Sequence, residues 1–412
     1  MRRLLFLLPF PPRLDATNGG SRTTAQLLLS LSARHHLALM VLRAASDPPV
    51  DAALQTKCQL IEEIVRPDPG FSLASGASRM GSLLRGWPLW VAGSSVGAFH
   101  ARVRLITQEW RPDIVNVDFH VMGQYLRSID DCPAPRVLIQ HEPGAAAARD
   151  RWQSTQGVRR AISYFDMRAW ERYERSIMRQ VQAVVVFSEI DREKLPQVSA
   201  PPRIVCIPAG TLVPAKPLNP VGDQAFSLLF VGNFRHPPNL EGAMRLVQDI
   251  FPNVQARVPN VHCFIVGDHP PVHLRRMANE AISVTGRVPD VTPYLDRAAV
   301  VIVPVRTGGG IRVKVKEALA AGKALVVSPL AVAGLDVMDG EQVLLAETDE
   351  QFAAAAARLL KNQEERGALA SRARAWACEH LGWEKPIAAY EDLYEQLTQE
   401  CPSSRLTEPL WR

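Results

Sequence analysis

The segment from Arg306 to Ser328 constrains the fold of this chain most strongly, because it joins a glycine-rich loop to regular structure on both sides. Its sequence is RTGGGIRVKVKEALAAGKALVVS, with three consecutive glycines ahead of an alanine-rich helical stretch. Apolar β-branched runs at residues 300–303 and 325–327 flank it. This order predicts a strand, a glycine loop, a helix and a second strand, which is the repeating unit of an α/β sheet.

The glycine loop has the composition of a binding site for a phosphate or diphosphate. Glycines admit positive φ and close approach of the backbone, and the first turn of a helix presents unpaired N–H groups to an anion. Arg312 and Lys314 add positive charges, and Glu317 offers a carboxylate for two hydroxyls of a ribose. Two plainer interpretations stay open, namely a turn that serves packing alone and a solvated salt bridge between Lys314 and Glu317.

This segment resembles the donor-binding segment of retaining glycosyltransferases of family 4, which have the GT-B fold. The likeness is to the glycine-triplet branch of that family. The usual family signature pairs two glutamates, and Glu317 matches the second of them, which binds the nucleotide ribose. The first glutamate would fall at Gly309. The resemblance therefore implies that backbone N–H groups or another side chain take over its contact with the donor sugar.

The resemblance implies an α/β fold with two Rossmann-like doubly wound domains facing across a cleft. A length of 412 residues suits two or three domains. We expect an acceptor-side domain over residues 1–207 and a sugar-nucleotide domain over 225–380. The proline-rich segment 208–224 lacks any helical or strand period and is expected to link them. Residues 381–412 are expected to form a helix that crosses back to the first domain, followed by a tail.

Two predicted strands in the first half end in polar residues. Residues 113–119 end near Asp118 and His120, and residues 136–140 are followed by His141. The carboxyl ends of parallel strands are where open α/β sheets bind ligands. By resemblance, these positions are near the donor sugar, and we predict a catalytic role for His141. A purely structural role for these histidines is the alternative.

The resemblance also distributes roles over the second half. Arg312 and Lys314 are expected to be catalytic, because they would stabilise the charge that grows on the β-phosphate as the glycosidic bond breaks. Arg235 stands in a turn where the family often has Arg and Lys, here replaced near Asn233 and Asn239. The predicted donor-binding residues are Gly19, Gly20, Gly309, Gly310, Ile311, Glu317, Arg287, Val288 and Arg235.

Composition excludes several other classes of protein. The net charge of +5 suits a polyanionic ligand or an anionic membrane surface, but no dense basic run or zinc finger indicates nucleic acid. Six widely spaced cysteines indicate a reduced, cytosolic and metal-free protein. The start, MRRLLFLLPFPP, imitates a signal peptide, but its apolar run at residues 4–8 is short and is better explained as a first strand.

Of two basic and aromatic segments, the first allows a weak peripheral membrane contact. Residues 69–108 contain no acid, and their arginines alternate with Leu and Trp. A helix pair packing under the first domain is the favoured interpretation. Residues 149–179 hold arginines and aromatics in a long helical pattern. This segment could guide a phosphorylated or lipid-linked acceptor, although a solvated helical face is the simpler account.

We therefore expect a metal-independent retaining glycosyltransferase of hexosyltransferase type, without a cofactor. It would move a sugar from a nucleotide-sugar donor to a hydroxyl of a glycan, lipid-linked or small-molecule acceptor, in synthesis of polysaccharide, glycolipid or other glycoconjugate. The expected location is the cytoplasm or the inner face of the membrane. One alternative is a silent GT-B module that only binds a sugar nucleotide. A distant alternative is an NAD-dependent oxidoreductase, which lacks its G-x-G-x-x-G fingerprint here.

Overall fold

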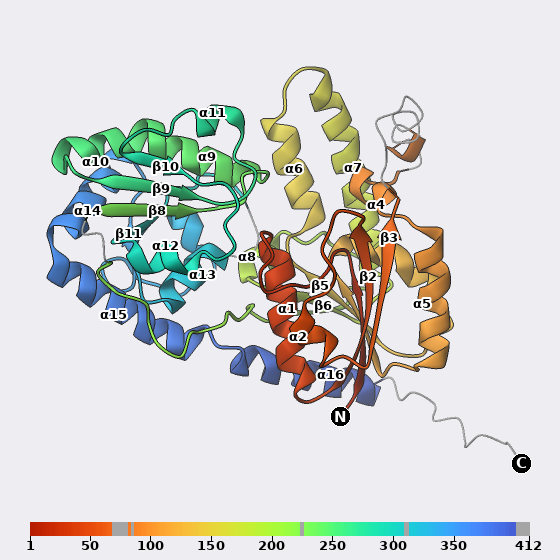
Figure 1. Cartoon of the computed structure of the whole chain (residues 1–412). Helices are drawn as coiled ribbons and strands as arrows, with labels where there is room; N and C mark the ends of the chain where they lie inside the picture. Colours follow the sequence, from red (N-terminus) through yellow and green to blue (C-terminus); the bar gives the residue numbers. More distant parts are fainter. Residues whose placement is uncertain (68–80, 84–85, 223–225, 309–312, 401–412) are drawn as a thin grey trace, which may run out of the picture. The chain divides into compact units, whose positions relative to one another are not determined.

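The short apolar runs of the sequence form parallel strands in the computed structural model, which describes residues 1–67, 81–83, 86–222, 226–308 and 313–400. These strands build two sheets, and each sheet is the centre of one unit (Figure 1). The first unit contains residues 1–14, 24–208 and the described residues from Glu384 onward. The second unit contains residues 15–23 and 209–383. The expected α/β class with two Rossmann-like sheets is confirmed.

The first unit has a seven-stranded parallel sheet in the order β3-β2-β1-β4-β5-β6-β7. The chain starts in the middle of the sheet, moves to one edge, and returns to build the other side, as in dinucleotide-binding folds. Its strands are β1 (Arg3–Leu8), β2 (His36–Ala44), β3 (Leu60–Arg66), β4 (Ile114–Asp118), β5 (Arg136–Gln140), β6 (Ala183–Val186) and β7 (Arg203–Cys206).

Helices cover this sheet, and one predicted helix is divided. Helix α1 begins at Gly19, one of the two glycines predicted to bind the donor, and α2 is a single turn that ends at Gln55. The long helix expected over 149–179 is two helices, because Gly157 takes φ of 63° and turns the chain. The helices are α1 (Gly19–Ser32), α2 (Ala52–Gln55), α4 (Leu89–Gly93), α5 (Gly97–Glu109), η1 (His120–Ile129), α6 (Gly144–Ser154), α7 (Val158–Met178), α8 (Glu189–Glu193) and α16 (Glu384–Glu400).

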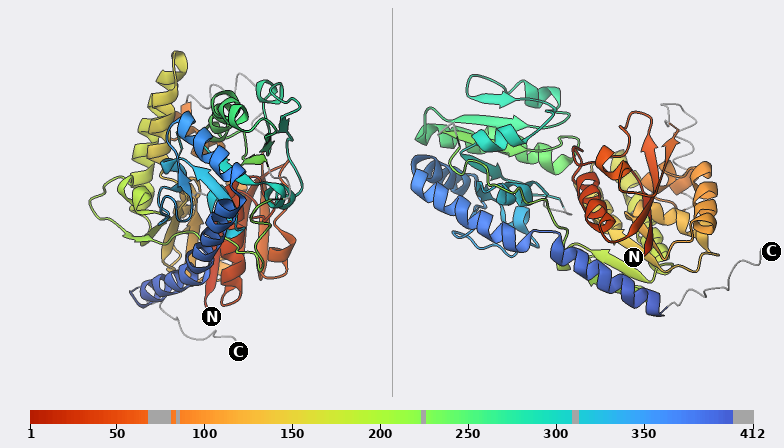
Figure 2. Two further views of the ribbon diagram at one scale, coloured as in Figure 1. Left: turned by 90° about the vertical axis from the view of Figure 1, so that its left-hand side faces the viewer. Right: turned by 60° about the horizontal axis from the view of Figure 1, so that its bottom comes forward.

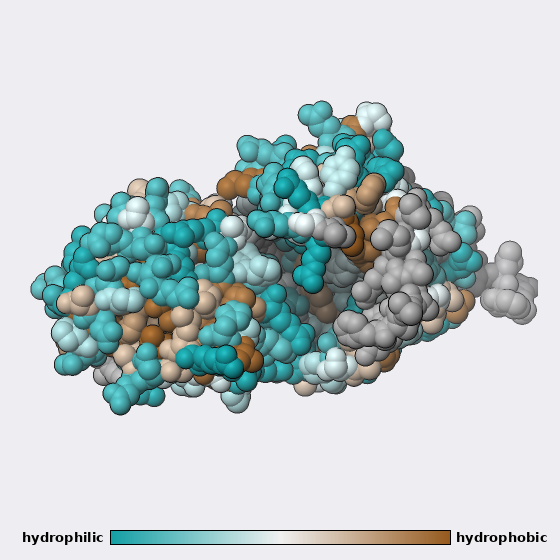
Figure 3. Space-filling model, turned by 90° about the horizontal axis from the view of Figure 1, so that it is seen from above, coloured by the Kyte–Doolittle hydropathy of each residue, from teal (hydrophilic) through white to brown (hydrophobic). Residues whose placement is uncertain are grey.

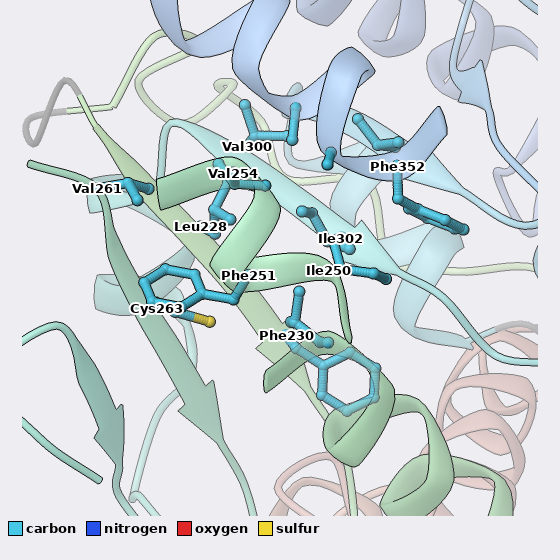
Figure 4. Close-up of a cluster of buried hydrophobic side chains, with 14 of the residues drawn as sticks. Leu228, Phe230, Ile250, Phe251, Val254, Val261, Cys263, Val300, Ile302 and Phe352 are labelled. Carbon is cyan, nitrogen blue, oxygen red and sulfur yellow. The ribbon is translucent and has the colours of Figure 1, made fainter. Parts of the chain in front are cut away.

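The second unit has a six-stranded parallel sheet in the order β10-β9-β8-β11-β12-β13. Its core lies between this sheet and the helices on one face, where Phe230, Phe251 and Phe352 are almost fully buried (Figure 4). The strands are β8 (Ser227–Val231), β9 (His262–Val266), β10 (Ile282–Val284), β11 (Val300–Val303), β12 (Ala324–Val327) and β13 (Leu344–Leu345).

The helices of the second unit include several that the sequence patterns did not single out. A single π-helical turn, η2, joins α9 to α10, and Asn362 separates α14 from α15. The helices are α9 (Pro237–Arg245), η2 (Leu246–Ile250), α10 (Phe251–Arg257), α11 (Val272–Arg275), α12 (Thr292–Arg297), α13 (Val313–Ala320), η3 (Pro329–Val332), α14 (Asp349–Lys361) and α15 (Gln363–His380).

Helix α16 returns to the first unit (Figure 2). Its apolar face buries Tyr390 and Tyr394, and the Tyr394 hydroxyl donates to Asn116 Oδ1 at 2.8 Å. Asn116 lies in the middle of β4 and is fully buried, so this hydrogen bond satisfies its Oδ1 inside the sheet, while its Nδ2 has no hydrogen-bond partner among the described residues.

Segment 69–108 supplies packing helices where the structure describes it. Phe99, Val103 and Ile106 of α5 are fully buried, and Arg102 pairs with Glu62 of β3. No helix of the described residues is long and apolar enough to cross a membrane. The five cysteines within the described ranges form no disulfide.

A buried polar chain holds α6 and α7 to the sheet. Gln140 links His120, whose Nδ1 lies 3.1 Å from Gln140 Oε1, to Glu174 of α7, which accepts a bond of 2.5 Å from Gln140 Nε2. Glu174 also accepts the N–H groups of Gly144 and Ala145 at 2.9 and 3.1 Å, and so caps α6. Burial lowers the pKa of His120 to about 4 and raises the pKa of Glu174 to about 7.

We expect Glu174 to destabilise the fold as pH rises. Its pKa is about 7 in the folded protein against an ordinary value of 4.5, so the folded state keeps a proton that the unfolded chain loses between these pH values. The unfolding free energy of wild type, minus that of Glu174→Gln, should fall by about 2–4 kcal/mol across this window. Urea unfolding at a series of pH values measures this difference.

Glu171→Gln is the matched control, because Glu171 lies on the same helix and pairs with the exposed Arg149 and Arg168. Its pH profile shows the effect of removing a carboxyl group from the same helix while Glu174 stays in place. A profile for Glu174→Gln that runs parallel to that of wild type would contradict the raised pKa of Glu174.

Candidate functional site

The loops at the carboxyl end of the second sheet pack tightly against one another. Gly267, after β9, has φ of 147°, and a Cβ there would lie 1.8 Å from the carbonyl oxygen of Gly232, which follows β8. The N–H of Gly267 donates to the carbonyl of Gly286, which follows β10. Because only glycine fits at 267, this edge of the sheet presents closely spaced backbone to whatever binds there.

The start of the predicted glycine loop, at Gly308, meets the turn that follows β8 and contains Arg235. Gly309, Gly310, Ile311 and Arg312 lie outside the described residues. The preceding Gly308 has φ of 105°, and a Cβ on it would lie 2.9 Å from Pro238 Cγ, in the first turn of α9. The Thr307 hydroxyl donates to Glu241 Oε2 at 2.8 Å. The entry to the glycine loop is thus fixed against α9.

Lys314 brings a positive charge to the start of α9. Its ammonium group donates to Asn239 Oδ1 and lies 4.7 Å from the centre of the Phe230 ring. Asn239 is one of the positions where the resemblance led us to expect a cation, and the cation comes from α13 instead. Burial, with a smaller contribution from the Lys314 charge, lowers the pKa of the nearby His236.

Glu317 lies one turn further along α13 and is partly buried. It forms an ion pair with Arg22, in the first turn of α1, and residues 15–23 belong to this second unit. Gly19 and Gly20 form the start of that turn, and a Cβ on Gly19 would lie 2.9 Å from Val313 Cγ2. The structure therefore brings the predicted glycine pair to the same helix, α13, that carries Glu317.

Lys316, which lies between Lys314 and Glu317 in sequence, is a buried lysine that binds backbone. It is 6% exposed, and its Nζ donates to the carbonyl of Ala209 at 2.7 Å. Burial lowers its pKa to about 8. This lysine ties α13 to Ala209, the first residue of the second unit after the chain crosses from the first.

The remaining predicted donor residues lie on loops. Arg235 and Arg287 are exposed, and Val288 packs partly against the apolar cluster around β11. The backbone N–H of Arg235 donates to Asn233 Oδ1 at 3.0 Å. The proposed role of residues 287 and 288 needs only backbone groups, which their loop position allows.

In the first unit, His141 forms a buried pair with Asp118. Its Nε2 lies 2.8 Å from Asp118 Oδ1, and the other carboxylate oxygen accepts a bond of 2.7 Å from Thr24 Oγ1. His141 is 5% exposed and Asp118 is 1% exposed. Asp118 Oδ1 can accept a hydrogen bond from an Nε2–H group, and the tautomer with its proton on Nε2 has Nδ1 as an acceptor. Nδ1 is buried and has no hydrogen-bond partner among the described residues.

Aromatic rings fix the orientation of the His141 imidazole. Phe119 stacks on it with 3.7 Å between ring centres and an interplanar angle of 10°, and Phe187 meets it edge-on at 4.9 Å. Phe119 has φ of 65°, which is strained for a bulky residue and is found mainly at functional sites. Sequence reasoning missed this strain, because the residues from Asp118 to His120 look like an ordinary strand end.

A metal centre has no support in the side chains that we see. No group of three or more His, Cys, Asp or Glu side chains is arranged to hold a metal ion within the described ranges. Independence from metal stays a prediction.

Comparison with known proteins places the second unit in context. Residues 225–362 match the family described as Glycosyl transferases group 1. No curated protein matches the chain.

Solved structures with the same fold cover nearly the whole chain. Sucrose-phosphate synthase from Thermosynechococcus elongatus is 16% identical with a TM-score of 0.70, over 97% of this chain and 100% of that one. WaaG, a glycosyltransferase involved in lipopolysaccharide biosynthesis, is 16% identical with a TM-score of 0.65, over 94% and 99%. HepE from Anabaena, in complex with UDP and glucose, is 12% identical with a TM-score of 0.64, over 97% and 100%.

At these identities the likeness concerns the fold, which is the GT-B fold of two Rossmann-like units. The family match of residues 225–362 and the fold of the whole chain together support a glycosyltransferase of the GT-B type.

Proposed function

We propose that this protein is a retaining glycosyltransferase of family 4 that moves a sugar from a nucleotide donor to an acceptor hydroxyl. The observation that carries the proposal is the meeting of the glycine-loop entry at Gly308 with the first turn of α9, beside the Lys314 ammonium group. A fixed cation beside closely packed backbone is what a diphosphate leaving group needs.

The second unit would hold the donor. Glu317 would accept two ribose hydroxyls, and Lys314 would contact the diphosphate together with Arg312, whose role rests on the sequence alone. As the glycosidic C–O bond breaks, negative charge moves to the β-phosphate, and these cations would stabilise it. UDP is the first nucleotide to test, because one neighbour was solved with UDP and glucose. No metal ion is required in this proposal.

The first unit would contribute His141 to the binding of the transferred sugar. With Asp118 holding Nε2, the unpartnered Nδ1 can accept a hydrogen bond from a hydroxyl of the transferred sugar. The proposal thereby gives a ligand to a buried polar atom that has no partner among the described residues. Retention follows from the resemblance, in which the acceptor hydroxyl attacks from the side of the leaving group without an enzymic nucleophile. The acceptor would be a glycan, a lipid-linked glycan or a small molecule.

A silent module that only binds a sugar nucleotide is the second candidate. Gly309 stands where the family has its first glutamate, and Asn233 and Asn239 stand near the places of its cations. Lys314 supplies one of these charges, so the enzyme is the better supported candidate.

Nucleotide binding tests the proposal first. In a thermal-shift screen against UDP, GDP, ADP, CMP and NAD, one nucleoside diphosphate should stabilise the protein, by about 2.7 kcal/mol at a hundredfold excess over Kd. The gain should shrink in Glu317→Ala and in Lys314→Ala, because each removes a contact to the nucleotide. Arg312→Ala should lower the transfer rate by roughly tenfold to a hundredfold.

Glu341→Ala and Arg275→Ala serve as controls, because both residues are exposed on the same unit and away from this turn. They should keep the full response. A response to NAD alone would favour an oxidoreductase, and donor binding without transfer or slow hydrolysis would select the silent module.

His141→Ala should lower kcat/KM by roughly tenfold to a hundredfold, because it removes the Nδ1 contact to the sugar. Binding of the bare nucleoside diphosphate, which would be held by the second unit, should change little. Steady-state kinetics and the same thermal-shift assay measure the two effects. His100→Ala is the control, since His100 also lies in the first unit and bonds Ser128 Oγ at 2.6 Å. Unchanged turnover in His141→Ala would contradict the role.

A further inference from the structure

The free end of the α6–α7 hairpin exposes apolar side chains that a packed domain would normally bury. Ile162, Tyr164 and Phe165 are 36%, 41% and 59% exposed. Elsewhere in the described residues, large exposed apolar side chains occur singly along the chain. Such a concentration marks an interaction site. We define the hairpin surface as Trp152, Arg159, Arg160, Ile162, Tyr164 and Phe165.

The hairpin surface is an ordered cluster that spans both helices. The rings of Trp152 on α6 and Tyr164 on α7 are 5.7 Å apart, and those of Tyr164 and Phe165 are 5.8 Å apart. The Arg160 guanidinium lies 5.5 Å from the centre of the Trp152 ring. The aromatic side chains are therefore held in place while still open to solvent.

Charge on the hairpin is separated between its inside and its outside. The acids Asp166, Glu171 and Glu174 are 9%, 8% and 0% exposed. Arginines occupy the exposed positions, and Asp150 is the exposed acid among the described side chains of the two helices. Neither Arg159 nor Arg160 takes part in an ion pair among the described residues. The outside of the hairpin is thus positive as well as aromatic.

The position of the hairpin leaves this surface accessible. Both helices extend beyond the sheet of the first unit, and the connection between them lies at the end farthest from that sheet (Figure 1). Seen from the side toward which the hairpin extends, hydrophobic patches are scattered among hydrophilic residues (Figure 3). A projecting end of this kind can enter a deformable surface.

We propose that the hairpin surface docks on an anionic lipid bilayer. Tyr, Trp and Phe side chains settle at the boundary between headgroups and acyl chains, and arginines bind lipid phosphates. The hairpin surface combines both types of side chain at one end of one supersecondary element. The bilayer would bury the exposed rings of Tyr164 and Phe165 while the arginines keep phosphate partners. This places the acceptor-side unit at the membrane.

Vesicle co-sedimentation of the full-length protein tests the proposal. The protein should bind vesicles of phosphatidylcholine with about one quarter phosphatidylglycerol more strongly than pure phosphatidylcholine, and less at about 1 M salt than at about 0.1 M. Tyr164→Ser/Phe165→Ser should lower the partition coefficient by about tenfold or more. Arg159→Glu/Arg160→Glu should abolish the preference for the anionic vesicles. All of these side chains are exposed, so the thermal midpoint of each variant should match that of wild type.

The second unit offers matched controls. Val272→Ser/Met338→Ser removes two apolar side chains of similar exposure, and Arg275→Glu/Arg276→Glu reverses an adjacent pair of exposed arginines. Both should retain binding. The proposal fails if wild type does not bind the anionic vesicles, or if the controls lose binding as much as the hairpin variants. It also fails if sedimentation without lipid shows self-association that the hairpin variants remove, since the surface would then bind a second copy.

Discussion

The structure depends on parallel strands that are buried on both faces. In β1, Leu4 to Leu8 are fully buried. The residues of β12 are fully buried as well, and those of β11 are almost fully buried. Such strands hold few polar side chains along their length, and those that they hold, such as Asn116, are hydrogen-bonded inside the sheet. Asp118 and His141 in the first unit, and the start of α9 in the second, lie at the carboxyl ends of strands, which is where open α/β sheets bind ligands. The helices then supply charges from a distance.

The two lysines of the short sequence KVK point in nearly opposite directions because they lie on one helix. Lys314 and Lys316 are two positions apart, so they project about 200° apart around the axis of α13. Lys314 points to the first turn of α9, and Lys316 is buried against the backbone of Ala209. A motif that looks uniformly basic in sequence is therefore divided into one cation at the start of α9, where we propose that the diphosphate binds, and one that holds the backbone of Ala209.

Much of the fold was predictable, because apolar runs bounded by glycine and proline identify strands, and the strand-loop-helix order identifies the sheet type. The position of His141 at a strand end followed from the same reasoning. The cap that Glu174 provides to α6 was not predictable, since the two partners lie about thirty residues apart on different helices. The same holds for Lys314 and Asn239, which are 75 positions apart. Gly157 was visible in the sequence, but a helical period on both sides concealed its break.

The return of α16 makes the first unit discontinuous in sequence, with consequences for its synthesis. A ribosome that has completed β7 must still translate the whole second unit before Tyr394 can reach Asn116. At bacterial to eukaryotic elongation rates this interval lasts roughly ten to thirty-five seconds. During that time the first sheet exposes apolar surface and a buried-type amide without its partner. The first unit is therefore completed last, whereas the second unit already has all of its residues, 15–23 and 209–383, once Trp383 has been translated.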